Sequence, residues 1–147
     1  METRRYQSKD ESDKIAITEI LKEELARHKE PYDEDAWFKH LKKRDSSLQN
    51  RNGMILAVDG DTVAGFVFSE VRHELSGIEY GYFHFPSVKK EYKTKVEELL
   101  CNEAIKYLKQ LGMKDIRTRI PPTHALAKSV ARKMNFQQHE LSWRVQT

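Results

Sequence analysis

The chain changes its hydrophobic period twice, and this change limits its fold more than any other feature. Apolar residues recur at helical spacing from Ile15 to Leu25, gather in short alternating runs over residues 54–85, and return to helical spacing from Val96 to Leu111. A period of 3.6 indicates an amphipathic helix, whereas a period of two indicates a half-buried strand. The sequence therefore predicts an α+β domain, with an antiparallel run of strands and helices packed on it.

The strands in the middle of the chain are separated by turn residues. Met54 to Val58 and Thr62 to Val71 flank Asp59-Gly60-Asp61, which predicts a hairpin whose glycine takes a positive φ. His73 to Gly77 is a second turn, and Ile78 to Phe85 is a third strand, rich in aromatic residues. These three runs predict an antiparallel meander.

The remaining segments complete a β-α-α-β-β-β-α-β-α-β order. They are a strand over 4–8, a helix over 10–28, a short helix from Asp33, a loop over 45–53, a helix from Thr94 to Leu111 with Gly112 after it, a strand over 115–120, a helix capped by Thr123 and ended by Asn135, and a strand over 136–145. No repeat or linker interrupts this order. We therefore predict a single domain over residues 1–147 with a mixed, mostly antiparallel sheet.

Composition excludes several classes of protein. The net charge of +3 is too small to indicate nucleic acid as a partner, and no apolar stretch approaches the roughly 20 residues of a membrane span. The first residues, METRRYQSKDE, lack the apolar core of a secretory signal, and one cysteine cannot form an internal disulfide. We therefore expect a cytoplasmic protein that uses neither a membrane nor a nucleic acid.

The ordered set of segments resembles the GNAT acetyltransferase superfamily. The resemblance rests on MILAVDGDTVAGFVFSEV, IEYGYFHF, VKKEYKTKVEELL and ALAKSVARKMNF in that order, and covers residues 4–145. In that family one strand splays from its neighbour, and a phosphate-cradling loop follows at a helix N-terminus. The resemblance implies a single GNAT-like domain with splayed central strands, acetyl-coenzyme A as co-substrate, and an amine of a small molecule or a protein as acceptor. A homodimer is compatible with it.

The resemblance also implies where coenzyme A would bind. Its pyrophosphate favours unpaired backbone N–H groups, positive charge and a helix N-terminus, and a free strand edge can hold the pantetheine arm. We expect the strand edge at Phe83 to Phe85 and the positive charge at the lysines around Thr94. The candidate cofactor-binding residues are Phe83, His84, Phe85, Lys90, Glu91, Tyr92, Lys93, Thr94, Lys95, Val96 and His124.

The loop departs from the family motif, which is roughly Arg/Gln-x-x-Gly-x-Gly/Ala. Glu91 stands at the Arg/Gln position, and Thr94 and Val96 stand where glycines allow backbone to approach phosphate. Thr94 to Glu97 also has the pattern of a capping box, which would use the N–H groups that the pyrophosphate needs. Two interpretations remain open here: a lysine-rich pyrophosphate site, or a capped surface helix.

Acetyl transfer to an amine needs a base for the amine and an acid for the leaving thiolate. The resemblance favours Glu79 as the base, although an exposed strand carboxylate is an equal alternative. His84, on the opposite strand face, belongs to the residue type that titrates near neutral pH, but a packed histidine is the commoner outcome. Counting back from Phe136 places Ala131 where the family often has the acidic Tyr, so the acid is unassigned.

Other reactive residue types have plainer interpretations. Ser129 and Tyr92 are nearby hydroxyls without evidence as acids, and Cys101 falls within a helix as a small buried residue. The histidines and the cysteine show no metal-ligand spacing, so we expect no metal. Trp37, Phe38 and Leu41 form an apolar stripe that we assign to the core.

Three functions therefore stay open. The first is an N-acetyltransferase in which the amine attacks acetyl-coenzyme A directly. The second is a catalytically impaired acyl-CoA-binding or regulatory module, because both glycines and the usual Tyr are missing. The third is an interaction domain whose exposed strand edge pairs with a partner.

Overall fold

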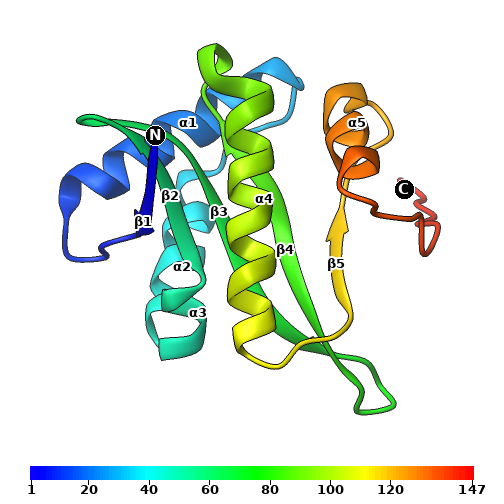
Figure 1. Cartoon of the computed structure of the whole chain (residues 1–147). Coiled ribbons are helices and arrows are strands. Elements are labelled where there is room, and N and C mark those ends of the chain that lie inside the picture. The colour runs from blue at the N-terminus through cyan, green and yellow to red at the C-terminus, as the bar shows by residue number, and fades with distance from the viewer.

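The computed structural model describes residues 1–147, which form one sheet with helices on both faces (Figure 1). The elements are β1 (Glu2–Arg5), α1 (Glu11–Arg27), α2 (Glu34–Asp45), α3 (Leu48–Asn52), β2 (Met54–Asp59), β3 (Thr62–His73), β4 (Glu79–Val88), a 3₁₀ turn (Lys90–Tyr92), α4 (Lys93–Gln110), β5 (Ile116–Arg119) and α5 (Ala125–Lys133). No helix is both long and apolar enough to cross a membrane.

The sheet has the strand order β1-β2-β3-β4-β5. Neighbours from β1 to β4 are antiparallel, and β5 pairs parallel to β4. That parallel pairing runs only from Gly81–Ile116 to His84–Arg119, while β4 continues to Val88. The two strands therefore diverge, as Figure 1 shows, and the predicted mixed sheet with splayed central strands is confirmed.

A bulge in β4 marks the point of divergence. Phe68 of β3 lies opposite His84, but Phe66 lies opposite Ser87, so β4 has one residue more than its partner over this interval. A bulge interrupts the ladder and re-aims the side chains on either side of it. Pro86, which has no N–H to donate, lies inside this interval, where the regular ladder is already interrupted.

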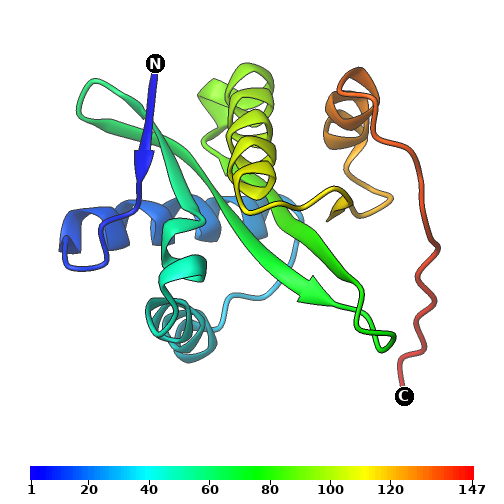
Figure 2. The ribbon, with the colours of Figure 1, turned by 60° about the horizontal axis from the view of Figure 1, so that its bottom comes forward.

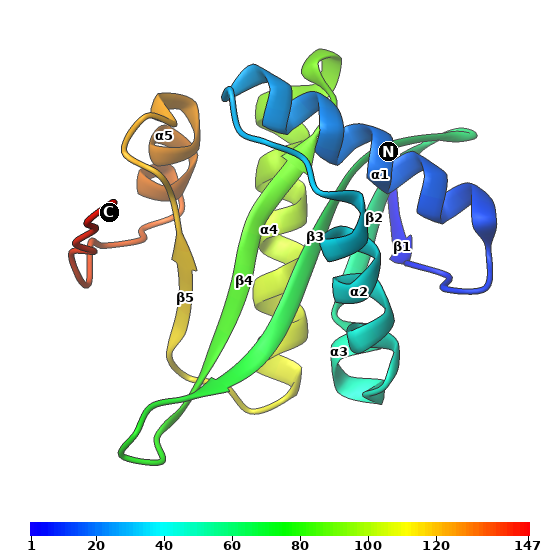
Figure 3. The ribbon, with the colours of Figure 1, turned by 180° about the vertical axis from the view of Figure 1, so that it is seen from behind.

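Each face of the sheet carries its own apolar cluster. The α4 face includes the fully buried Phe83 and Leu100, and the α1–α2 face includes Trp37, Leu41 and Phe68. Figure 3 shows α1 and α2 in front of the sheet with α4 behind it. The prediction that Trp37, Phe38 and Leu41 belong to the core is confirmed, because Trp37 and Leu41 are buried and Phe38 packs, partly buried, against the same cluster.

Several turn predictions are confirmed by backbone angles. Gly60 and Gly112 have φ values of 61° and 87°, and Asn135 ends α5 at a φ of 65°. The predicted polar loop over 45–53 is wrong in part, because Leu48–Asn52 forms α3 after the cap residue Ser47. Its five residues are too few for a hydrophobic period to reveal.

The predicted last strand over 136–145 is wrong. Phe136 packs against Phe83, but the following residues have no regular structure, and Leu141 and Trp143 are exposed. Figure 2 shows this segment leaving the body of the domain beyond α5. Alternating side chains make a segment competent to be a strand, but a strand forms only when a partner satisfies its backbone, and β5 is paired on one side only.

Candidate functional site

A cavity of about 270 Å³ opens where β4 and β5 diverge. Four elements build it: the end of α1, the second half of β4, the start of α4 and the start of α5. It is lined by Glu24, Arg27, His28, Phe85, Pro86, Val88, Lys93, Glu97, Thr123, His124, Ala125, Leu126 and Ala127. The cavity therefore lies in the opening that the splayed strands create.

The strand edge facing this opening begins later than expected. Phe83 and His84 are paired with Thr118 and Arg119 of β5, and the Thr118 hydroxyl donates to the Phe83 carbonyl at 2.7 Å. Phe83 and His84 are therefore not a free edge, which corrects that part of the Phe83–Phe85 expectation. Beyond this pairing, β4 has no β5 partner from Phe85 to Val88.

The start of α4 is not closed by the expected capping box. The helix begins at Lys93, one residue before Thr94, and its cap residue Tyr92 makes no side-chain cap bond. Glu97 is instead buried, with 8% of its surface exposed, and lines the cavity. The N–H groups of the first turn therefore have no side-chain partner, which is the arrangement that attracts an anion.

The predicted loop residues are distributed over different environments. Lys93 lines the cavity, whereas Lys90, Glu91, Thr94 and Lys95 are exposed. Val96 is buried in the core. The Tyr92 hydroxyl donates to Asp59 at 2.9 Å, so it is held against the β2–β3 hairpin and not over the cavity.

Two carboxylates from α1 approach the same region. Glu24 accepts a hydrogen bond from the Ser87 hydroxyl of β4, and Glu23 accepts from the Lys90 backbone N–H at 3.3 Å. Burial raises the pKa of Glu24, and burial raises the pKa of Glu97 to about 7. The cavity is thus lined by the carboxylates of Glu24 and Glu97 together with Arg27 and Lys93. The sequence spacing did not reveal this combination.

His124 lies in the cavity at the start of α5. Its ring stacks on His28 with the centroids 3.6 Å apart, and its Nε2 atom is buried without a hydrogen-bond partner. Burial and then His28 lower the pKa of His124. A neutral ring with an unpaired nitrogen can exchange a hydrogen bond with an amide of a bound ligand.

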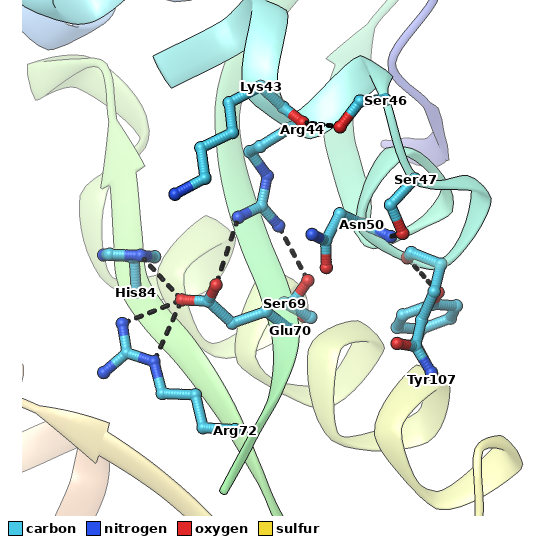
Figure 4. Close-up of polar contacts among 11 residues, drawn as sticks. Lys43, Arg44, Ser46, Ser47, Asn50, Ser69, Glu70, Arg72, His84 and Tyr107 are labelled. Atoms are coloured by element: carbon cyan, nitrogen blue, oxygen red, sulfur yellow. Dashed lines mark hydrogen bonds and ion pairs between the residues drawn. The ribbon is translucent and has the colours of Figure 1, made fainter.

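A second polar cluster lies on the α2 face, one residue before the divergence (Figure 4). His84 Nε2 is 3.4 Å from Glu70 Oε1, and the same oxygen accepts from Arg72 Nη2 at 2.8 Å. Arg44 approaches the other Glu70 oxygen at 3.8 Å and donates to the Ser69 carbonyl at 2.7 Å. One oxygen of the Glu70 carboxylate therefore contacts both His84 and Arg72.

The electrostatics of this cluster keep Glu70 ionised. Its hydrogen bond with His84, followed by that with Arg72, lowers the pKa of Glu70 to about 2 against the opposing effect of burial. Burial lowers the pKa of the neighbouring His40 to about 4, so that ring is neutral at pH 7. Of the Glu70–His84 pair, His84 is the residue open to a substrate, because 44% of its side chain is exposed.

Glu79, the base expected from the family resemblance, lies at the far end of β4. It is 53% exposed, is 2.9 Å from His73 Nε2, and faces His73 across the hairpin. Phe85 lies six positions further along the chain, which is about 20 Å of extended strand. Glu70 is not among the residues predicted for the site, although an acid within the mostly apolar β3 run was a usable signal.

Neither Ser129 nor Tyr92 replaces the usual Tyr beside the cavity, and the only hydroxyl among the lining side chains is that of Thr123. Ala131 is buried, and the Ser129 hydroxyl donates to the Ala125 carbonyl within α5. Cys101 is also buried, and burial raises the pKa of its thiol to about 12, so it is not an activated nucleophile. None of these three side chains is therefore placed to act as an acid at the cavity.

Comparison with protein-family models and with curated proteins finds no match to this sequence. Solved structures do match. An aminoglycoside 6'-N-acetyltransferase from Acinetobacter haemolyticus has a TM-score of 0.75 at 16% identity, covering 100% of this chain and 98% of that chain. The Arabidopsis thaliana glucosamine-6-phosphate N-acetyltransferase has a TM-score of 0.71 at 10% identity, covering 99% and 97%.

The NatC complex bound to Gag peptide and CoA contains a third similar chain, with a TM-score of 0.77 at 15% identity over 95% of this chain and 86% of that chain. These structures belong to N-acetyltransferases of the GNAT superfamily. The chain therefore has the GNAT fold, and the resemblance that the sequence suggested is confirmed at the level of the fold.

Proposed function

We propose that the chain is an N-acyltransferase that uses acetyl-coenzyme A and a primary amine. One observation carries this proposal: β4 and β5 diverge directly beyond His84, which contacts Glu70, and the next residue of β4, Phe85, lines the cavity. A thioester held at the divergence would lie between its binding groove and a base. The structurally similar acetyltransferases support the activity class.

The residues of the cavity suit the pantetheine arm and the pyrophosphate of coenzyme A. Phe85, Val88 and Ala127 supply apolar contact, and His124 Nε2 supplies an unpaired polar atom. The open first turn of α4 and Lys93 would face the pyrophosphate. Binding of the pyrophosphate would require the Lys90 N–H to leave Glu23. That hydrogen bond is long and exposed, so its loss costs little free energy.

His84 is the proposed base. Glu70 Oε1, which lies 3.4 Å from His84 Nε2, would favour the tautomer that carries its proton on Nε2, and this would leave Nδ1 free to take a proton. The amine nitrogen attacks the thioester carbonyl carbon, the C–N bond forms and the C–S bond breaks. His84 takes the amine proton, and the thiolate leaves without a dedicated acid. A thiolate is a stable enough leaving group for this.

An acyl-CoA-binding module without turnover is the second candidate. The observation in its favour is the missing acid, since Ala131 is buried and no phenolic hydroxyl lines the cavity. The two candidates share the cavity and differ in whether the Glu70–His84 pair transfers a proton. Binding and turnover must therefore be measured separately.

Acetyl-coenzyme A is expected to raise the melting temperature of the chain by about 5–10 °C at 100 times its Kd, because a ligand that binds the folded state adds about 2.7 kcal/mol of stability at that concentration. Lys93→Glu should weaken binding at least fivefold, since it reverses a charge at the α4 N-terminus. Differential scanning fluorimetry and calorimetry measure both effects.

The matched control for that variant is Lys106→Glu, an exposed position on the same helix away from the cavity. It should bind acetyl-coenzyme A as the parent does. Thiol release with an amine panel then separates an enzyme from a binding module. Equal binding by the Lys93 and Lys106 variants, or no stabilisation at millimolar acetyl-coenzyme A, would refute the proposed site.

Binding of acetyl-coenzyme A should weaken about two- to fivefold between pH 6 and pH 8. The pKa of Glu97 is raised to about 7 by burial, so its carboxyl is mostly neutral at pH 6 and anionic at pH 8, where it repels the phosphates. The same ionisation lowers the stability of the unliganded chain as pH rises from about 4.5 through 7, because the folded state holds the proton more tightly than the unfolded state.

Glu97→Gln is expected to remove this pH dependence in calorimetric titrations. The control is Glu98→Gln, one residue further along α4, whose carboxylate pairs with Lys133 outside the cavity. A parent chain that binds equally at both pH values would contradict the placement of Glu97 beside the phosphates.

A further inference from the structure

The side chains around His84 are mostly cationic. Tyr80, Tyr82 and His84 alternate onto one face of β4, and Arg117 packs over the Tyr80 ring at 4.0 Å on that same face. Arg119 follows Arg117 by two residues on β5 and therefore shares its face, with its Cα paired to that of His84. Arginine side chains of β5 therefore border the surface beside the proposed base.

The same surface is bounded by arginine on the β3 side. Arg72 lies over the Tyr82 ring at 3.6 Å and donates from Nε and Nη2 to Glu70. Its side chain is 37% exposed, and Nη1 makes no bond within the chain. Lys43 extends from α2 toward these strands, as Figure 4 shows.

The carboxylates on this surface are already paired with basic side chains. Glu70 is shared by Arg44, Arg72 and His84. Glu74 and Asp115 both pair with Arg117. Arg119 is exposed and makes no ion pair or side-chain hydrogen bond. Two guanidinium groups, those of Arg72 and Arg119, therefore flank His84 with donors free for a ligand.

Stacking on tyrosine prepares Arg72 for recognition of an anion. A guanidinium laid flat on an aromatic ring keeps its edge donors in a fixed plane, and such a fork matches the geometry of a carboxylate or a phosphate. A polycation would be repelled by the same groups. A polycation would instead be attracted to the acidic start of α2, at Glu34 and Asp35. These residues lie nearly two turns before His40.

We infer that the acceptor is a small primary amine that also carries an anionic group, a carboxylate or a phosphate, held by Arg72 and Arg119 beside His84. This inference rests on the proposed function for the transfer itself. The binding preference follows from the charges alone. This binding preference distinguishes the inferred acceptor, an anionic amine, from a polycationic amine.

The experiment compares amines in matched pairs. Glucosamine 6-phosphate against glucosamine tests a phosphate, β-alanine against its amide tests a carboxylate, and spermidine tests a polycation. Thiol release gives KM and kcat with acetyl-coenzyme A, and calorimetry gives amine binding without turnover. The anionic member of at least one pair should have a KM and a Kd about tenfold lower or more.

Arg119→Gln should remove that preference by raising KM for the anionic amine about tenfold, with kcat and the neutral amine little changed. Lys109→Gln, which removes one exposed positive charge on α4 across the sheet, should leave the preference intact. The inference is overturned if both members of each pair bind equally, if spermidine binds best, or if Arg119→Gln retains the preference. If no amine is acylated but the anionic amines still bind through Arg119, the inference stands and the proposed function fails.

Discussion

Replacing His84 by glutamine is expected to lower kcat for acyl transfer by about 10²–10⁴-fold, the usual contribution of a positioned base. Glutamine keeps a polar side chain of similar reach that can bond Glu70, but it cannot accept and release a proton near neutral pH. His84 is 44% exposed and lies outside the two apolar clusters, so the variant should fold. Thiol release under saturating amine measures kcat, and calorimetry with acetyl-coenzyme A should show an unchanged Kd.

Glu79→Gln is the matched comparison, because the family resemblance and the mechanism proposed here assign the amine proton to different residues. Glu79 contacts His73 at the far end of β4, so its replacement should change kcat less than threefold. The opposite ranking, in which Glu79→Gln is inactive and His84→Gln is active, would restore Glu79 as the base and remove the Glu70–His84 pair from the mechanism. An inactive parent chain would favour the binding module.

The fold could be predicted because its signals are local. The change of hydrophobic period, the turn at Gly60 and the αL residue Asn135 each act within a few residues, and all are confirmed. The failed last strand had the correct alternation but no partner beyond β5. Sequence periodicity reports which side of a strand can be buried, and it does not report whether another strand is present to pair.

The site was predicted less well because it depends on contacts between distant segments. Glu24 reaches Ser87 across 63 positions, and Arg44 reaches Ser69 across 25. Neither contact leaves a motif in the sequence. The capping box at Thr94 failed for a related reason: Glu97 is drawn into a cavity that α1 and α5 complete, and burial there competes with a local bond to the helix start.

Arg44→Met is expected to lower the free energy of unfolding by about 2–4 kcal/mol, because one partner of a buried ion pair is removed and the others remain. Arg44 is 3% exposed, donates to the Ser69 carbonyl at 2.7 Å, and lies 4.9 Å from the Phe68 ring centroid. Methionine retains much of the packing of the stem but leaves that carbonyl without its donor. Urea unfolding of both chains measures the difference.

Lys43→Met is the control, since Lys43 precedes Arg44 on α2 and is exposed, and its replacement should change stability by less than about 0.5 kcal/mol. Equal stabilities of the two variants would show that Arg44 contributes nothing by its burial. Glu70→Gln completes a double-mutant cycle, and a coupling energy of about 0.5–3 kcal/mol is expected if Arg44 and Glu70 interact directly.

The Arg44 variant also tests how the core supports the proposed base. Arg44 is one of three groups that keep Glu70 ionised, after His84 and Arg72. Well below the unfolding midpoint, Arg44→Met should therefore retain most of its kcat at pH 7, because the two remaining partners still hold the carboxylate. A large loss of kcat in a folded Arg44→Met chain would mean that Arg44 positions Glu70 and, through it, His84, and would extend the catalytic machinery from the surface of the sheet to the core beneath α2.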